Sequence, residues 1–164
     1  MQLPSLLRRL GLALAVLGLA LEVQAQTPAA VRPSYAELVD PLTGTLSSYE
    51  LSAGNTYPVI SRPWGMNSWT PQTGKMGDGW QYTYTAQKLC GIKQTHQPSP
   101  WINDYGQFSL LPMTGKAPVF DEEKRASWFS HKAEEARPYS YEVYLADYDT
   151  RIRMAPSERA AVFE

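Results

Sequence analysis

This 164-residue sequence has few cysteines and histidines, and its positive and negative charges nearly balance. The one cysteine, Cys90, excludes an internal disulfide, and with it a disulfide scaffold or a multi-cysteine zinc or iron–sulfur site. The 15 basic and 16 acidic residues give a net charge of −1, which lacks the basic footprint of a nucleic-acid-binding protein. The two histidines, His96 and His131, have no third partner at a zinc-like spacing, so we predict no metal site within this chain.

Long hydrophobic runs are also missing, apart from one near the N-terminus. Arg8 and Arg9 precede an uncharged apolar run over residues 10–21, and Val-Gln-Ala at residues 23–25 is a small-x-small cleavage site. The alternative is a transmembrane anchor, but the apolar run is shorter than the ~20 residues that a bilayer core requires. The sequence therefore predicts a signal peptide over residues 1–25, export to the periplasm or the extracellular space, and no membrane anchor.

Aromatic residues and prolines are abundant, with 5 Trp, 10 Tyr and 13 Pro. This mixture suits strands and ordered loops better than helices. Alternation of apolar and polar residues predicts strands over residues 80–85, 141–145 and 150–154, the last two forming a hairpin, with further candidates at residues 108–111 and 46–51. Only residues 121–136 have a helix-like composition. Short strands separated by Pro and Gly predict an all-β fold, an antiparallel β-sandwich.

The domain organisation follows from the same pass along the chain. Residues 26–33 are rich in Pro and Ala and are expected to be a flexible lead-in. Residues 34–164 show no linker and no internal repeat, so we predict one sandwich domain there. The apolar, strand-like run at residues 160–163 is followed only by Glu164. It is either an unfinished strand of a truncated domain or a natural C-terminal edge strand, and the pattern alone does not choose between them.

The densest polar and aromatic stretch is KQTHQPSPWINDYG, residues 93–106. Its two prolines favour an ordered loop between strands, and loops of this kind carry binding sites on sandwich scaffolds. A tryptophan face packs on the apolar side of a pyranose ring, while amide, carboxylate and imidazole groups bond its hydroxyls. We therefore predict substrate contacts from Trp80, His96, Trp101, Asn103 and Asp104. The alternative is a structural loop in which Trp101 lies in the core and Asp104 caps a turn.

A second polar group is Ser-His-Lys-Ala-Glu-Glu at residues 130–135. His131 could serve as a general base or a metal ligand, although an exposed histidine beside acids is the commoner arrangement. Glu134 and Glu135 are neighbours, so in an extended segment they would point to opposite faces and could not act together on one bond.

An ordered series of motifs resembles the N-terminal domain of glycoside hydrolase family ninety-two, the secreted calcium-dependent α-mannosidases. The series is GNTYP, PWGM, WTPQTG, GW, KQTHQPSPWINDYG, SLLPMTG, RASWFSHKAEEA, VYLADYD and SERAAVF, and it covers almost all of residues 26–164. Three positions depart from the family pattern. Trp64 stands where Phe is common, Gln107 where Asp often follows DYG, and Ser140 where Gly often follows Pro-Tyr.

The resemblance implies an N-terminal β-sandwich of a two-domain, inverting exo-α-mannosidase several times longer than this chain. It also implies that a following helical barrel supplies the catalytic acid and base and most of the calcium site. The active site would lie between the two domains. On this interpretation the chain is a fragment with no catalytic residue of its own, and its partners are a mannose-containing glycan and the missing C-terminal catalytic domain.

Two further function classes remain open at this point. One is a free-standing, non-catalytic carbohydrate-binding module, and the other is a structural sandwich of the cell envelope. A genuine stop codon after Glu164 would favour the module, whereas a reading frame continuing into helical, Glu-rich sequence would favour the mannosidase.

Overall fold

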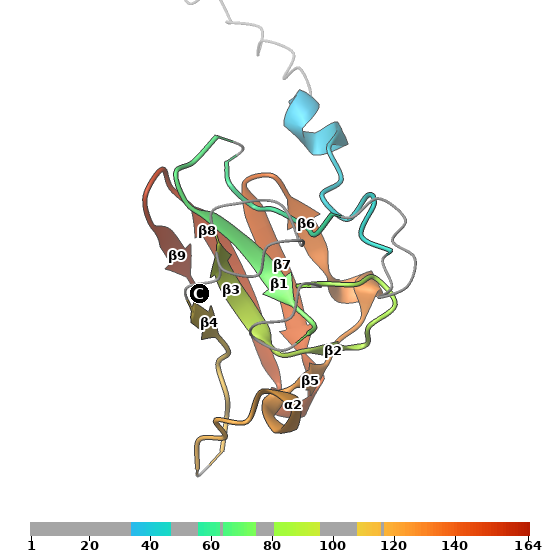
Figure 1. The fold of residues 1–164 in the computed structure, drawn as a ribbon, viewed down its shortest axis with the longest axis vertical. Coiled ribbons are helices and arrows are strands. Elements are labelled where there is room, and N and C mark those ends of the chain that lie inside the picture. Colours follow the sequence, from blue (N-terminus) through green and yellow to red (C-terminus); the bar gives the residue numbers. More distant parts are fainter. Residues whose placement is uncertain (1–33, 47–55, 63, 75–80, 96–107, 116) are drawn as a thin grey trace, which may run out of the picture. The chain divides into compact units, whose positions relative to one another are not determined.

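The computed structural model describes residues 34–46, 56–62, 64–74, 81–95, 108–115 and 117–164, all within one compact unit, Ser34–Glu164 (Figure 1). Strands in antiparallel sheets dominate this unit and helices are short. Among the described residues, no helix is long and apolar enough to cross a membrane. The elements, in chain order, are η1 (Tyr35–Leu38), β1 (Ser68–Gln72), β2 (Lys88–Leu89), β3 (Gly91–Thr95), β4 (Phe108–Leu110), α2 (Glu122–Arg125), β5 (Ser127–Trp128), η2 (His131–Ala133), β6 (Glu135–Arg137), β7 (Ser140–Leu145), η3 (Ala146–Tyr148), β8 (Thr150–Pro156) and β9 (Ala161–Phe163).

The larger sheet has four strands in the order β6-β7-β8-β9. Its centre is the predicted hairpin: β7 and β8 pair antiparallel and are joined through η3 and Asp149, whose φ of 47° is left-handed. Burial alternates along both strands, with the apolar side chains inside and the polar ones outside, as expected when one face of a sheet meets the core. The hairpin prediction is confirmed.

The outward face of this sheet carries paired charges. Arg151 on β8 donates to the Glu142 carboxylate on β7 at 2.6 Å, and Arg153 donates to the Glu164 carboxylate at 2.6 Å. These groups are exposed, so each pair contributes little to stability, but together they mark a face suited to water.

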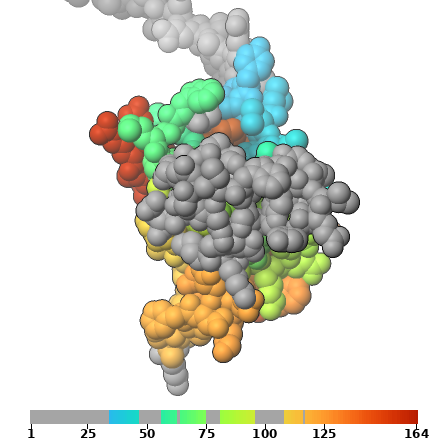
Figure 2. All heavy atoms as spheres, viewed as in Figure 1, coloured from blue at the N-terminus to red at the C-terminus, as the bar shows by residue number. Residues whose placement is uncertain are grey.

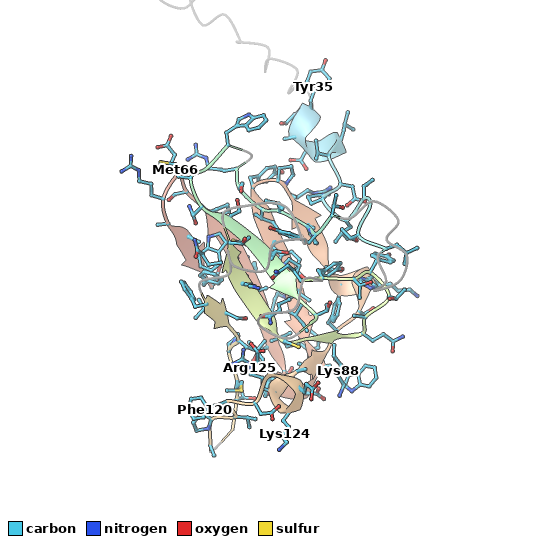
Figure 3. The ribbon with its side chains drawn as sticks, viewed as in Figure 1. Tyr35, Met66, Lys88, Phe120, Lys124 and Arg125 are labelled. Carbon is cyan, nitrogen blue, oxygen red and sulfur yellow. The ribbon has the colours of Figure 1, made fainter. Side chains whose placement is uncertain are left out.

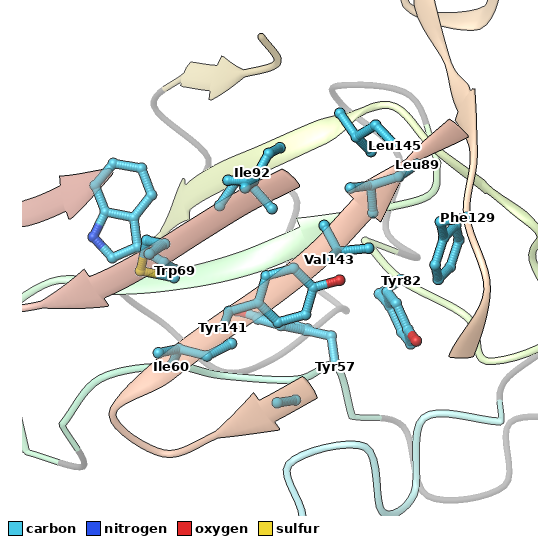
Figure 4. Packing of buried hydrophobic residues seen from close by; sticks show 13 residues of the cluster. Tyr57, Ile60, Trp69, Tyr82, Leu89, Ile92, Phe129, Tyr141, Val143 and Leu145 are labelled. Atoms are coloured by element: carbon cyan, nitrogen blue, oxygen red, sulfur yellow. The ribbon is translucent and has the colours of Figure 1, made fainter. Parts of the chain in front are cut away.

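The second sheet has three strands in the order β1-β3-β4, and a two-stranded sheet pairs β2 with β5. The core packs between the sheets, and Figure 4 shows buried residues of different strands meeting there. Trp69 of β1 contacts a phenylalanine from each of the two larger sheets edge-on, Phe108 of β4 at 5.7 Å and Phe163 of β9 at 5.0 Å between ring centroids. The predicted all-β antiparallel sandwich is confirmed.

The edge strands agree with the sequence as well. The expected strand at residues 108–111 is β4, and the apolar run near the C-terminus forms β9, which pairs with β8. Of the candidate strand at residues 46–51, Leu46 is not in a strand and the remainder lies outside the described residues.

The predicted strand at residues 80–85 is wrong over its described part, because residues 81–85 are irregular and contain a turn at Tyr84 and Thr85. The alternating aromatics do not share a face: Tyr82 is buried and Tyr84 is exposed. The Ala86 N–H closes the turn onto the Thr83 carbonyl at 3.0 Å. The alternation therefore reflects individual side-chain contacts and not a pleated ladder.

The predicted helix at residues 121–136 is also wrong, except for its first turn. Asp121 caps α2 by accepting from the Lys124 N–H at 3.0 Å, but α2 ends at Arg125 and Ala126 is no longer helical. The chain then extends into β5, which pairs with β2, before η2 and β6. Tertiary pairing overrides the weak helical preference of this stretch.

Candidate functional site

The predicted substrate-contacting residues Trp80, His96, Trp101, Asn103 and Asp104 lie outside the described residues, so their predicted roles stay predictions. The structure does describe what flanks them. Residues 96–107 connect the end of β3 to the start of β4, two neighbouring antiparallel strands of one sheet.

The sheet β1-β3-β4 that bears these connections has a polar outer face. Strand alternation places Ser68, Thr70 and Gln72 of β1 on one side, opposite Trp69 and Pro71. The register pairs Thr70 with Lys93 and Ser68 with Thr95 across the β1–β3 ladder.

These polar side chains are buried, although the outer face of a two-layer sandwich normally meets water. All five residues of β1 are buried, so both of its faces are covered. Buried polar groups require hydrogen-bond partners, and the described contacts supply some of them. Tyr57 and Thr95 approach within 3.4 Å through their hydroxyls, the hydroxyls of Ser61 and Ser68 bond to each other, and the Gln72 amide donates to the Gly74 carbonyl at 2.8 Å.

Two acceptors on the same sheet have no hydrogen-bond partner among the described residues, Gln72 Oε1 and Ser109 Oγ. Gly91 faces Ser109, and a Cβ at position 91 would lie 2.2 Å from Ser109 Oγ and 3.0 Å from the Leu110 carbonyl oxygen. A larger residue at position 91 would displace the Ser109 hydroxyl and press on the β4 backbone, so glycine suits this close approach. The side chains that the structure describes on this face carry hydroxyl, amide and ammonium groups and include no carboxylate for acid–base work, and those of β1 and β3 on it are buried.

The best-connected carboxylate in the described structure is Glu134, between η2 and β6. Its side chain is fully buried and accepts from Tyr82 Oη at 3.0 Å, from Tyr141 Oη at 2.7 Å and from His131 Nδ1 at 2.5 Å. Glu135, the next residue, has a side chain that is 62% exposed and pairs with Arg137 at 3.2 Å. The two neighbouring acids do point to opposite faces, as predicted.

Both ring nitrogens of His131 make hydrogen bonds. Its Nε2 lies 2.7 Å from the Tyr84 carbonyl oxygen, which can only accept, so Nε2 carries a proton. Its Nδ1 lies 2.5 Å from the Glu134 carboxyl group, so both ring nitrogens contact groups of the domain. The Tyr84 ring stacks on the His131 ring with ring centroids 4.0 Å apart.

Because both ring nitrogens are already in close contact with groups of the domain, neither is open to a metal ion or to a substrate proton. The role of general base or metal ligand is therefore excluded for His131 in this geometry, and its side chain is only 25% exposed. The four groups tie together η2, β7 and residues 82–84. We call Glu134, His131, Tyr82 and Tyr141 the Glu134 cluster.

We predict that the Glu134 cluster makes the folded domain less stable at alkaline pH. Burial, and then the charge of Glu134, raise the pKa of Tyr82 and raise the pKa of Tyr141 well above the ordinary value near 10. Below pH ~10 the folded and the unfolded chain both keep the hydroxyl protons of Tyr82 and Tyr141, so the two tyrosines contribute fully to the free energy of unfolding. Above it the unfolded chain releases protons that the folded chain keeps, so the free energy of unfolding falls by about 1.4 kcal/mol per pH unit for each tyrosine.

Urea unfolding between about pH 9 and pH 11 measures this slope. The double variant Tyr82→Phe, Tyr141→Phe should flatten it relative to the wild type, whatever its stability at neutral pH. An unchanged slope in the double variant would assign the alkaline loss to other groups.

Among the described residues, no group of three or more His, Cys, Asp or Glu side chains is placed to hold a metal ion. Cys90 is buried between β2 and β3, as expected for a small hydrophobic side chain, and burial raises the pKa of its thiol.

Comparison with known proteins adds to this geometry. Residues 38–164 match the family model described as the glycosyl hydrolase family 92 N-terminal domain. A search of curated proteins found no match.

Two solved structures from Bacteroides thetaiotaomicron resemble the chain. One, from strain VPI-5482, is an inverting mannosidase of family GH92 with 47% identity and a TM-score of 0.72, covering 79% of this chain and 17% of that one. The other is a GH92 α-mannosidase in complex with mannoimidazole, with 30% identity and a TM-score of 0.66, covering 78% of this chain and 17% of that one. The chain thus spans about one-sixth of the length of these structures.

Proposed function

This chain belongs to glycosyl hydrolase family 92, as the N-terminal domain of that family, and we propose that it supplies substrate contacts to the hydrolysis of α-mannosidic bonds in glycans. On this proposal it is not catalytic by itself and acts only when joined to a C-terminal catalytic domain.

The observation that carries the proposal is its 47% identity to an inverting mannosidase, across 79% of this chain but only 17% of that enzyme. Similarity at this level over a whole domain supports a shared role for the domain. The small share of the enzyme that is covered leaves most of the catalytic machinery to the remaining polypeptide.

The chemistry of inversion supports the same division. An inverting glycosidase needs one carboxylic acid to protonate the leaving oxygen and one carboxylate to activate water, roughly 6.5–9.5 Å apart. In the described structure, Glu134 is occupied by three donors and Glu135 by Arg137. The Asp147 carboxylate accepts from the Trp128 N–H at 3.0 Å, and Asp149 accepts from Tyr144 Oη at 2.6 Å. Each of these carboxylates already has a partner within the domain.

Residues 96–107 carry the proposed contacts His96, Trp101, Asn103 and Asp104, and they follow Thr95 at the end of β3. The polar side chains of the β1-β3-β4 face are buried and pack within the domain. A stacking tryptophan beside hydrogen-bonding side chains is the chemistry that recognises a mannopyranose.

The proposal also covers the calcium site and the location of the protein. The described residues include no group of three or more His, Cys, Asp or Glu side chains placed to hold an ion, so we assign calcium to the remaining polypeptide. The signal peptide expected over residues 1–25 would export the protein to the periplasm or the extracellular space.

Trp101→Ala tests the substrate contacts directly in the complete enzyme. Loss of a stacking face should lower kcat/KM about tenfold or more, equivalent to ~1.4 kcal/mol of transition-state binding, and should leave the Tm nearly unchanged. Steady-state kinetics on an α-mannoside and thermal unfolding are the measurements.

Trp128→Ala is the matched control, because Trp128 is half-exposed on β5 with the Lys88 ammonium 5.0 Å above its ring. It should leave kcat/KM unchanged. If Trp101→Ala instead lowers the Tm strongly while the folded enzyme keeps normal kinetics, Trp101 belongs to the core and the proposed contact is wrong.

A further inference from the structure

We propose that one apolar surface of this domain docks the catalytic portion of the same polypeptide. We call it the η1 surface, and it consists of Tyr35, Leu38, Val39, Trp64 and the pocket between them. The inference rests on the proposed function, since it names the partner that completes the enzyme, and it places that partner on described residues.

The first observation is that η1 presents its apolar side chains to solvent. None of its four residues is buried, and Tyr35 is 85% exposed and Leu38 77% exposed. Figure 3 shows Tyr35 extending away from the sheets. A one-turn helix that buries nothing gains no stability from its hydrophobic residues.

The polar side of η1 is nevertheless fixed to the domain. The Glu37 carboxylate lies 3.6 Å from Arg137 Nε and accepts from the hydroxyl of Tyr139. The Ser34 hydroxyl accepts from the Ala36 N–H at 3.3 Å and caps the helix. The helix is thus held by its single acid, with its apolar residues directed outward.

The second observation is a tryptophan on a constrained turn. Trp64 is 92% exposed, yet the backbone around it is anchored: the N–H groups of Ser61 and Arg62 both donate to the Pro138 carbonyl, at 3.0 and 2.7 Å, and the Met66 N–H donates to the Glu158 carbonyl at 2.7 Å. Arg62 has a left-handed φ of 74°.

Gly65 fits this turn because an added Cβ would lie 2.6 Å from the Ser61 carbonyl oxygen. A large aromatic side chain held on a rigid backbone loses little entropy on binding, and tryptophan is enriched among the residues that dominate interface energies.

A pocket of about 670 Å³ lies between these two elements, lined by residues of η1 and of the segments that follow it, together with Thr56, Tyr57, Val59, Trp64 and Pro138. Figure 2 shows η1 (blue) and the region around Trp64 (green) at the same end of the domain. The lining is mainly apolar, which suits a protein side chain better than a sugar with several hydroxyls to satisfy.

The β6-β9 face is more charged than the η1 surface. It carries the ion pairs Glu142–Arg151 and Arg153–Glu164 beside the exposed Val162, and charged residues are depleted in interface cores. This chain covers only 17% of the similar mannosidase, and an exposed apolar patch is typical of a contact site, so we assign the η1 surface to the remaining polypeptide.

Cysteine labelling tests the proposal, because the single native cysteine, Cys90, is buried. Leu38→Cys reports on the η1 surface, and Arg151→Cys on the charged face is the matched control. Maleimide labelling, located by peptide mass spectrometry, is compared in the 164-residue chain and in the polypeptide encoded by the complete reading frame. We expect both sites to react readily in the chain, and Leu38→Cys alone to become at least about tenfold slower in the complete polypeptide. Trp64→Asp should restore the labelling of Leu38→Cys there.

Three outcomes overturn the proposal: equal labelling of Leu38→Cys in both forms, protection already present in the chain alone, or a reading frame that stops after codon 164. Protection in the chain alone that grows with concentration would identify a second copy as the occupant. Concentration-independent protection would identify residues 1–33 as the occupant.

A mannoside assay of the same samples separates the docking proposal from the proposed function. An active enzyme in which the Leu38→Cys thiol is unprotected refutes only the docking surface, and a protected but inactive protein refutes only the proposed function.

Discussion

The 164-residue chain by itself is expected to release no product from an aryl α-mannoside, with or without excess calcium. Hydrolysis with inversion needs a general acid and a general base at a fixed separation, each with a pKa tuned by its surroundings. Glu134 cannot serve because Tyr82, Tyr141 and His131 occupy it, and Glu135 points the other way into an ion pair with Arg137. Asp104 could orient a hydroxyl but could not fill both roles.

The assay compares the purified chain with the polypeptide from the complete reading frame at equal molar concentration. The complete polypeptide should turn over the substrate, and the chain should not exceed the buffer blank. Turnover by the chain alone that disappears in Asp104→Asn would overturn the two-domain interpretation and make the connection at residues 96–107 the catalytic centre.

Removal of the Glu134 carboxylate is expected to be the most damaging single change to the fold. Glu134→Ala leaves two buried hydroxyl donors without an acceptor and removes the partner of His131 Nδ1. Each buried polar group left unpaired costs about 1–3 kcal/mol, so the total is a large part of the ~5–15 kcal/mol that stabilises a typical domain. Urea unfolding of the chain should show a correspondingly lower midpoint.

Two variants locate the cause of this loss. Glu135→Ala is the matched control, because its carboxylate is exposed and its ion pair contributes no more than about 1 kcal/mol. Glu134→Gln keeps the shape of the side chain and one acceptor oxygen, but it replaces the other oxygen with an amide donor that faces other donors. Its free energy of unfolding should therefore lie between those of Glu134→Ala and Glu135→Ala. Equal stability of Glu134→Ala and Glu135→Ala would show that the Glu134 cluster does not stabilise the fold.

Much of the fold could be predicted because some strands meet the core on one side only. Along β7 and β8 every second residue is buried, and this appears in the sequence as a period of two. The same reasoning cannot find β1, since all five of its residues are buried and one of them is Pro71. A strand covered on both faces has no alternation to detect, and a proline argues against a strand in the first place.

Contacts between distant residues account for the other errors. Tyr82 is buried because its hydroxyl reaches Glu134, 52 residues later, and no local pattern encodes that bond. The sequence does place His131 and Glu134 three residues apart, which is the one local signal for the cluster. It does not reveal that the Tyr84 carbonyl occupies the second ring nitrogen, which is the contact that excludes catalysis and metal binding.

The position of the β7–β8 hairpin sets the order in which the domain can fold. Its two strands are joined by a short connection, so they can pair within microseconds, whereas β1 and β3 must close a much longer loop. Tyr141, Val143, Leu145, Ile152 and Met154 of this hairpin supply five of the thirteen buried residues of the hydrophobic cluster. During synthesis they leave the ribosome after every other described strand except β9. The nascent chain therefore carries Tyr57, Ile60, Trp69 and Ile92 without these packing partners until the hairpin emerges.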